Sequence, residues 1–222
     1  ERHLAVVRAR GWFAGRAPDV QARLAGIARA RRHAAGAVIY REGDAPDGLH
    51  GLIAGEIELA FPSDAGEEFA IHRAEPGYWI GDLALFSGAR RLVTVRAVTD
   101  AETLFLPARA VRDLIEADPA LIEDFYALSH ENTRLALRLI AMLGQQSSER
   151  RVALWLLLHD EHVGTGEWLR TPRREIASLT GLSEPTVGRI LRRFGEAGLI
   201  ALDYGRIRVL DRDRFERFCR TT

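Results

Sequence analysis

The stretch from Thr171 to Phe194, TPRREIASLTGLSEPTVGRILRRF, constrains the fold most, because it contains two short helical patterns and a tight turn. Gly181 lies at the break, where a helix end commonly needs the left-handed backbone conformation that glycine adopts freely. Ser183 is placed to cap the second helix, and Pro185 falls in its first turn, where a missing N–H costs little. The apolar residues recur at helical spacing: Ile176, Ala177 and Leu179, then Val187, Ile190, Leu191 and Phe194.

Arginines occupy the outer side of the second helix, which we expect over about residues 184–195. Two helices, one small-residue turn and a basic outer face are typical of a helix-turn-helix that enters the major groove of DNA. An ordinary helical hairpin with a solvated arginine face has the same pattern. The pattern alone therefore leaves both interpretations open.

Charge is unevenly divided along the chain, although the formal net charge of the 222 residues is zero. Residues 165–222 hold 12 Arg and 8 acidic residues, whereas residues 1–164 hold 19 Arg and 23 acidic residues. A basic C-terminal part on an acidic body agrees with phosphate contact at one end of the protein.

Composition excludes several classes of protein. Cys219 is the only cysteine, which rules out an internal disulfide framework and any four-cysteine metal or iron–sulfur site within one chain. No Ser/His/Asp signature, Walker loop or HExxH motif is present, so we expect no catalytic residues and no metal site. No apolar run approaches about 20 residues and no signal peptide is visible, so we expect a cytoplasmic protein without a membrane partner.

The N-terminal part changes its period near Gly36. Residues 1–33 have the pattern of short amphipathic helices, whereas the following segments alternate or run apolar over four to eight residues. Glycines separate these segments: Gly43, Gly55, Gly66, Gly77, Gly81 and Gly88. Many short strands with glycine at the corners predict a small antiparallel barrel or jelly roll.

A long helical run follows, over about residues 119–147, with Asp118 as its expected N-cap. Its apolar ladder has spacings of 4, 3, 4, 3, 4 and 3 and is interrupted once by a polar residue: Leu121, Phe125, Leu128, Asn132, Leu135, Leu139 and Met142. A heptad ladder with one polar position predicts a parallel homodimeric coiled coil, and its alternative is a helix packed on its own domain.

The wording of these segments resembles the cyclic-AMP receptor protein/fumarate-nitrate regulator (Crp/Fnr) family of bacterial transcription regulators. LTGLSEPTVGRILRRFGEAGLI resembles its DNA-binding domain, and REGD and IAGEIEL resemble early turns of its β-roll. The resemblance implies an α+β chain with three parts: a double-stranded β-roll sensor domain at 1–118, a central dimerisation helix at 119–147 and a winged helix-turn-helix at 148–222. It also implies a homodimer on a near-palindromic DNA site, with RNA polymerase as a further partner of the exposed loop expected at residues 160–163.

The resemblance assigns roles to residues of the DNA-binding domain. Arg173 and Ser183 are expected to contact phosphates, and Thr186 a phosphate or a base edge. Arg189 is expected to reach a base, with Arg192 and Arg193 along the DNA backbone. Glu184 takes one of the family's two specifying positions; Pro185 takes the other and cannot accept from cytosine, so the operator is expected to differ. Arg206 and Arg208, on a hairpin wing, are further candidates for phosphate contact.

GDLALFSGARRLVTVRA, residues 81–97, resembles the family's phosphate-binding cassette. The resemblance places Gly81, Asp82, Leu83, Arg91 and Leu92 at an effector site. There a helix N-terminus and the arginine hold a phosphate, and the acidic residue accepts from a ribose hydroxyl.

Four residues depart from the cyclic-AMP pattern. Asp82 replaces a Glu, Leu92 replaces a Ser or Thr, and Ala136 and Leu137 replace hydroxyls expected to face the purine. These departures argue against cyclic AMP and leave open a purely structural role for the cassette, another anion or a small ligand.

Haem is a further cofactor known in the family, and His72 and His130 are its candidate ligands, although no partner ligand stands at a recognisable spacing. An alternative function is a cyclic-nucleotide or haem sensor whose C-terminal domain mainly contacts protein.

Overall fold

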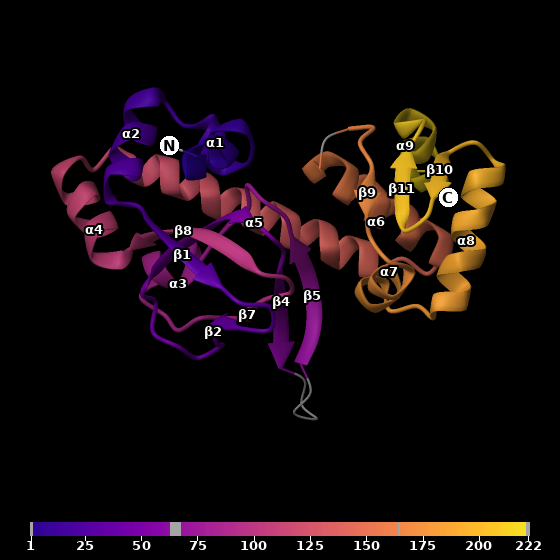
Figure 1. The fold of residues 1–222 in the computed structure, drawn as a ribbon, viewed down its shortest axis with the longest axis horizontal. Helices are drawn as coiled ribbons and strands as arrows, with labels where there is room; N and C mark the ends of the chain where they lie inside the picture. The colour runs from indigo at the N-terminus through magenta and orange to yellow at the C-terminus, as the bar shows by residue number, and fades with distance from the viewer. Residues whose placement is uncertain (1, 63–67, 164, 221–222) are drawn as a thin grey trace. The chain divides into compact units, whose positions relative to one another are not determined.

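The computed structural model describes residues 2–62, 68–163 and 165–220. The chain divides into two compact units, residues 1–135 and 136–222, and the long helix α5 (Leu121–Leu143) contains the boundary (Figure 1). The division expected at residues 118 and 147 stays a prediction.

The first unit is a β-roll made of two four-stranded antiparallel sheets, with strand orders β1-β8-β3-β6 and β2-β7-β4-β5. The first sheet contains β1 (Arg29–His33), β3 (Gly48–Ala54), β6 (Trp79–Ile80) and β8 (Ala101–Pro107). The second contains β2 (Val38–Tyr40), β4 (Ile57–Pro62), β5 (Glu68–Ala74) and β7 (Thr94–Ala97). This confirms the expected jelly-roll architecture. Five of the six corner glycines have positive φ, and Gly66 lies outside the described residues.

Helices pack beside the first sheet of the roll: α1 (Arg2–Ala9), the 3-10 helix η1 (Trp12–Gly15), α2 (Pro18–Ile27), α3 (Asp82–Ser87) and α4 (Ala108–Ala117). The expectation of helices throughout residues 1–33 is wrong at its end, because β1 is an edge strand paired with β8. The sequence RARRH shows no apolar alternation. Its side chains are instead held at the surface, where Arg31 stacks 3.3 Å from the Phe105 ring centroid and Arg32 pairs with Glu102.

An aromatic cluster fixes α5 to the roll. Phe125 is fully buried, with its ring centroid 5.6 Å from that of Trp12 and 5.1 Å from that of Phe86. Trp12 also contacts Trp79 of β6 at 5.3 Å and donates its indole N–H to the Asp124 carbonyl at 2.6 Å. Aromatic rings at such separations add to the free energy of burial.

The expected coiled-coil ladder is therefore wrong as a dimer seam over its N-terminal half. Leu121, Phe125 and Leu128 belong to the core of the first unit, and Asn132 donates to the Trp79 carbonyl and to Asp82 Oδ1 within the same chain. Leu135 and Met142 are buried and Leu139 is half-buried. Heptad spacing reports an apolar face but not what covers it, and here the chain itself covers that face.

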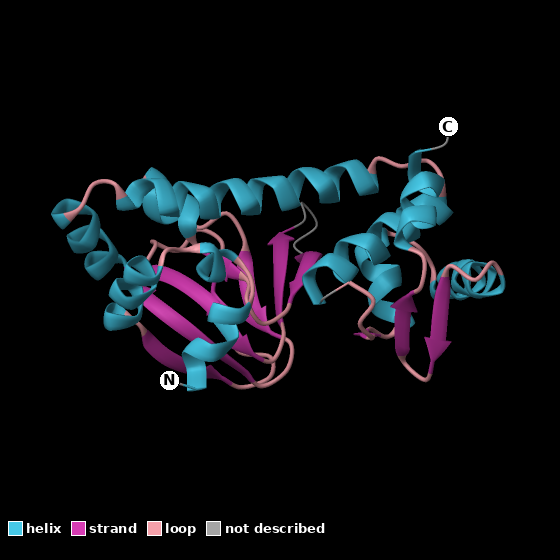
Figure 2. Cartoon of the chain, turned by 90° about the horizontal axis from the view of Figure 1, so that it is seen from above, coloured by secondary structure: helices cyan, strands magenta, loops and turns pink. Residues whose placement is uncertain are grey.

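The second unit has the winged-helix element order, and its helices and strands are coloured cyan and magenta in Figure 2. It contains α6 (Ser148–Val163), β9 (Leu169–Arg170), α7 (Arg173–Thr180), α8 (Glu184–Glu196), β10 (Ile200–Asp203), β11 (Arg206–Val209) and α9 (Arg212–Arg220). Its three strands form an antiparallel sheet in the order β10-β11-β9. Throughout the described residues, none of the helices combines the length and apolar character that crossing a membrane requires.

Truncating Phe125 tests the packing of α5 on the roll. We expect Phe125→Ala to lower the free energy of unfolding by about 3–5 kcal/mol, because it opens a cavity in a fully buried aromatic cluster. Urea denaturation followed by circular dichroism measures this loss. Glu123→Ala, at an exposed position of the same helix, is the control and should change little. Equal, small losses in both variants would contradict the packing.

Candidate nucleic-acid interface and effector site

The helix-turn-helix expected at residues 171–194 is present. Gly181 ends α7 in the left-handed region, with φ 64° and ψ 35°, and the Leu182 N–H returns to the Ala177 carbonyl at 2.9 Å. Ser183 then caps α8, because its Oγ accepts the Thr186 N–H at 3.4 Å. Pro185 lies in the first turn of α8. The sequence thus specifies the turn locally, and the apolar faces of both helices are buried as expected.

Most of the residues expected to contact DNA share one exposed surface. Arg173, Ser183, Glu184, Arg189, Arg192 and Arg193 are exposed, and Thr186 is half-buried. Arg173, at the start of α7, reaches across to α8, since a Cβ added at Gly188 would lie 3.7 Å from its Nη1. Its guanidinium therefore lies against α8 at Gly188.

These arginines differ in what they already contact. Arg193 pairs with Glu149 of α6, so part of its charge is used within the protein. Among the described residues, Arg189 and Arg192 have no hydrogen bond or ion pair, which leaves both guanidinium groups available to an anionic partner. Guanidinium groups bind phosphate and guanine edges bidentately.

The wing adds a second basic surface. Trp168 lies beneath two arginines of β11, with the Arg206 guanidinium carbon 5.2 Å and that of Arg208 4.8 Å from the ring centroid. Arg206 also pairs with Asp203 across the hairpin. Tyr204, at the hairpin turn, is 99% exposed. Stacking on an aromatic ring restricts arginine side chains and prepares them for contact.

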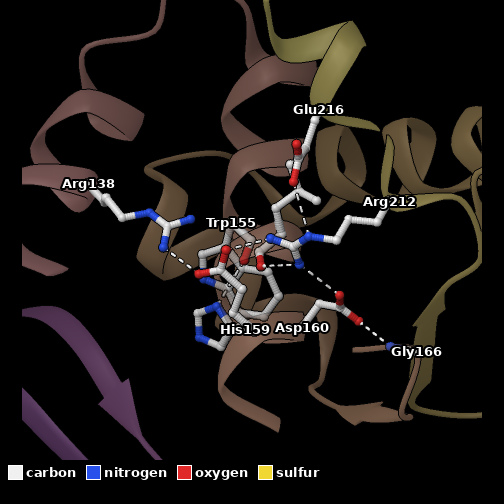
Figure 3. Close-up of polar contacts among 9 residues, drawn as sticks. Arg138, Trp155, His159, Asp160, Gly166, Arg212 and Glu216 are labelled. Carbon is white, nitrogen blue, oxygen red and sulfur yellow. Dashed lines mark hydrogen bonds and ion pairs between the residues drawn. The ribbon is translucent and has the colours of Figure 1, made fainter. Parts of the chain in front are cut away.

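A buried ion-pair network holds the helices behind this surface (Figure 3). Asp160 of α6 is fully buried and accepts Arg212 Nη1 at 2.9 Å and the Gly166 N–H at 2.9 Å. Arg212, at the start of α9, also contacts Glu161 at 2.5 Å and Glu216 at 3.1 Å. Its carboxylate neighbours raise the pKa of Arg212 against the opposing effect of burial, so the guanidinium stays charged. The network ties α6 to α9.

This network corrects the expected polymerase-contact loop. Residues 160–163 belong to α6, and Asp160 is inaccessible. Glu161 is shared between Arg212 and Arg138 of α5. The acidic run DEH resembles a solvated loop in sequence, but Asp160 is buried and both carboxylates pair with arginines that lie more than 20 residues away, although Glu161 stays exposed.

The expected effector residues do not form an open anion site. Arg91 is 2% exposed and donates through Nη1 to the Gly81 carbonyl at 3.0 Å. Its Nη2 donates to the Gly48 carbonyl at 2.7 Å and to Asp47 Oδ1 at 2.8 Å. The guanidinium also lies 4.2 Å from the Tyr40 ring centroid. Protein groups therefore surround it.

The remaining cassette residues divide between the interior and the surface. Asp82 is buried and its Oδ1 accepts Asn132 Nδ2 of α5 at 2.8 Å. Leu83 and Leu92 are 46% and 55% exposed. Gly81 precedes α3 with φ 109°, and a Cβ there would lie 2.5 Å from Arg91 Nη1, so only glycine leaves room for the guanidinium.

Asp47 and His50 are functional neighbours that the sequence did not reveal. His50 Nε2 lies 3.7 Å from Asp47 Oδ1. The contact with His50, and after it that with Arg91, holds the pKa of Asp47 well below its ordinary value. Burial lowers the pKa of His50, so the imidazole is neutral near pH 7. No motif marks Asp47, because its importance depends on Arg91, which lies 44 residues later.

Other candidate ligands have ordinary surroundings. His72 is buried with its ring 5.5 Å from that of Tyr78, whereas His130 is exposed on α5. Within the described part of the chain, no group of three or more His, Cys, Asp or Glu side chains is arranged to hold a metal ion. Burial raises the pKa of Cys219 to about 11, so its thiol is a poor nucleophile at pH 7.

Two family models match the chain. The cyclic nucleotide-binding domain matches residues 30–118 and the Crp-like helix-turn-helix domain matches residues 150–218. These ranges correspond to most of the roll with α4, and to the winged helix-turn-helix.

Curated relatives match most of the chain. The HTH-type transcriptional regulator Cmr of Mycobacterium tuberculosis (strain CDC 1551 / Oshkosh) is 29% identical over 218 residues, covering 93% of this chain and 86% of the relative. The cyclic AMP receptor protein of Thermus thermophilus is 27% identical over 197 residues, covering 89% and 91%. FixK2 from Bradyrhizobium japonicum has a TM-score of 0.77 at 20% identity, covering 88% and 99%, and so shares the fold.

The Asp160–Arg212 pair provides a test of the scaffold. We expect Arg212→Met to lower the free energy of unfolding by about 3–5 kcal/mol, because it leaves a fully buried carboxylate without its cation. Urea denaturation measures the loss. Arg214→Met is the matched control, since exposed Arg214 makes only a surface contact with the Ala197 carbonyl. If both variants unfold at the same urea concentration as the wild type, the network contributes nothing.

Proposed function

Because the chain belongs to the Crp/Fnr family of DNA-binding transcription regulators, we propose that it acts as a homodimer that places two α8 helices in successive major grooves. Two-fold symmetry then requires a near-palindromic operator with half-sites about 34 Å apart. The reported relatives are regulators rather than enzymes. The observation that carries the proposal is the shared exposed surface of Arg173, Ser183 and Arg189 beside a capped helix N-terminus.

Contacts divide into those that position the protein and those that specify sequence. Arg173 is suited to phosphates, because it presents an exposed guanidinium that reaches across to α8. Arg189 lies in α8 and is suited to a base edge. Pro185 has no side-chain acceptor for the cytosine amino group, and Glu184 precedes it, so Glu184 is the acidic group nearest the position of cytosine recognition.

The outer face of α5 is the proposed dimer seam. One position after the buried ladder, with the same spacings of 4, 3, 4, 3, 4 and 3, it carries five exposed apolar residues together with half-buried Ser129 and exposed Thr133: Ile122, Tyr126, Ser129, Thr133, Ala136, Ile140 and Leu143. Ile122, Tyr126 and Ile140 are 45%, 73% and 66% exposed. A second helix of the same kind covers such a stripe through coiled-coil packing, and the small residues at its centre allow close approach.

In the proposed dimer, the roll influences DNA binding only by favouring one placement of the two winged helix-turn-helix domains. An input to the roll shifts the population when it binds the DNA-competent form more tightly than the other form. Any contact with RNA polymerase must be made by residues other than Asp160, because Asp160 is buried.

Two arginine variants test the reading of DNA. We expect Arg189→Ala to remove about 1–3 kcal/mol of discrimination between a site selected from random DNA and a scrambled site. We expect Arg173→Ala to weaken binding to both DNAs alike and to reduce the slope of log K against log salt by about 1. Fluorescence anisotropy over a salt series measures both quantities. Arg112→Ala, exposed on α4, is the control. Undiminished discrimination in Arg189→Ala would contradict the placement of α8.

A charge on the outer face of α5 tests the seam. We expect the wild type to have twice the chain mass of 24.7 kDa, and Ile140→Asp to have the mass of one chain at micromolar concentration, because association would bury the new carboxylate. Light scattering after size-exclusion chromatography measures the mass. Arg134→Asp places a carboxylate on another exposed face of the same helix and should stay dimeric. Dimeric Ile140→Asp would remove this seam from consideration.

A further inference from the structure

We propose that Arg151 is a positioning residue for DNA recognition, because its guanidinium joins the linker between α5 and α6 to the turn of the helix-turn-helix. The linker is defined as residues 144–147, between the end of α5 and the start of α6. All of these elements belong to the second unit or to the part of α5 within it. The inference rests on the proposed function, and it assigns a role to a residue that acts through the turn rather than on the DNA.

Arg151 holds two backbone segments with one side chain. It lies near the start of α6 and is half-buried. Its Nη2 donates to the Gln145 carbonyl of the linker at 2.8 Å, and its Nη1 donates to the Thr180 carbonyl at the end of α7 at 3.0 Å. The donors of a guanidinium have fixed directions in one plane, so the two bonds together set the separation of the two carbonyls.

The bond to Thr180 supplies a partner that α7 lacks. The last four carbonyls of an α-helix have no N–H partner within the helix. At the end of α7, the Ala177 carbonyl accepts from the Gly181 and Leu182 N–H groups, whereas the Thr180 carbonyl accepts from Arg151. A cation at this end also interacts favourably with the helix dipole. Arg151 therefore caps α7 from a different helix.

The capped end of α7 leads directly into the turn. Gly181 follows Thr180, and a Cβ added at Gly181 would lie 3.7 Å from Arg151 Nη1. Ser183 then caps α8. The start of α6 contacts α8 as well, because Glu149 pairs with Arg193. The first residues of α6 thus contact both helices of the helix-turn-helix.

The other bond of Arg151 leads back to α5. The Gln145 N–H donates to the Met142 carbonyl at 3.1 Å, and Gln145 Nε2 donates to the Ala141 carbonyl at 3.1 Å. The linker is therefore tied to the last turn of α5. A displacement of that turn moves the Gln145 carbonyl, and Arg151 connects this carbonyl to the end of α7. The contacts form a continuous path from α5 to the turn that presents Ser183.

DNA binding by full-length variants tests the role of Arg151. We expect Arg151→Met to lower the affinity for a site selected from random DNA about tenfold, because two charge-assisted hydrogen bonds that hold the turn are lost. The affinity for a scrambled site should fall less than about twofold, and the slope of log K against log salt should stay unchanged, since Arg151 neutralises no phosphate. Arg151→Lys keeps a cation and should lose less than about threefold for the selected site. Fluorescence anisotropy over a salt series measures these quantities.

Arg150→Met is the matched control. Arg150 precedes Arg151 and is also half-buried, but its side chain points about 100° away around α6. This variant should bind both DNAs as the wild type does. Wild-type discrimination in Arg151→Met, even with a lower melting temperature, would overturn the proposal and leave Arg151 a purely structural residue. An equal loss on both DNAs with a smaller salt slope would also overturn it, because that pattern marks a direct phosphate contact.

Hydrogen–deuterium exchange without DNA separates this inference from the proposed function. We expect Arg151→Met to speed amide exchange in residues 177–187 about tenfold, since the end of α7 loses its cap, and Arg150→Met to leave it unchanged. Exchange in the roll, followed at residues 48–62, should be the same in all proteins. A wild type that binds no DNA would contradict the proposed function, whereas unchanged exchange in residues 177–187 of Arg151→Met would contradict the role of Arg151.

Discussion

The packing of Phe125 among Trp12, Phe86 and Trp79 commits one face of α5 to the roll, and much of the structure depends on that commitment. Once this face is buried, the remaining apolar residues of the helix lie one position further along the sequence and face outward. A rotation of about 100° per residue separates the two stripes. The same helix can therefore contribute to the core of its own chain and still offer a long apolar surface to a second chain.

The sequence predicted those features that interactions between neighbouring residues determine. The turn of the helix-turn-helix was predictable because Gly181 and Ser183 act on their own helix ends, and the basic face because four arginines follow within about 20 residues. The β-roll was predictable from strand periodicity and from glycines with positive φ. The strand at Arg29–His33 was not, because its pairing with β8 depends on residues 70 positions away rather than on its own pattern.

The sequence did not predict those features of the sites that depend on residues far away in the chain. The heptad ladder on α5 was identified with its correct period, but a period does not say whether the roll or a second chain covers it. Arg91 matches the position of a phosphate ligand in the family, and its contacts with Asp47 and Gly48 were not predictable because these residues precede it by more than 40 positions. The sequence predicts a solvated loop at Asp160, whereas Asp160 is buried and pairs with Arg212. In each case the sequence indicated the character of the side chain but not the residue or surface that it contacts.

Asn132 connects these observations. It interrupts the buried apolar ladder between Leu128 and Leu135, where a polar residue costs stability unless its hydrogen bonds are made. Its two bonds, to Asp82 and to the Trp79 carbonyl, satisfy the side-chain amide and fix α5 at one height along the roll. An apolar residue at this position would permit the helix to slide or rotate on a uniformly apolar surface. The rotation of α5 decides which stripe faces outward, and the outward stripe is the proposed dimer seam. The hydrogen bond between Asn132 and Asp82 therefore links the cassette to the stripe that we propose as the dimer seam.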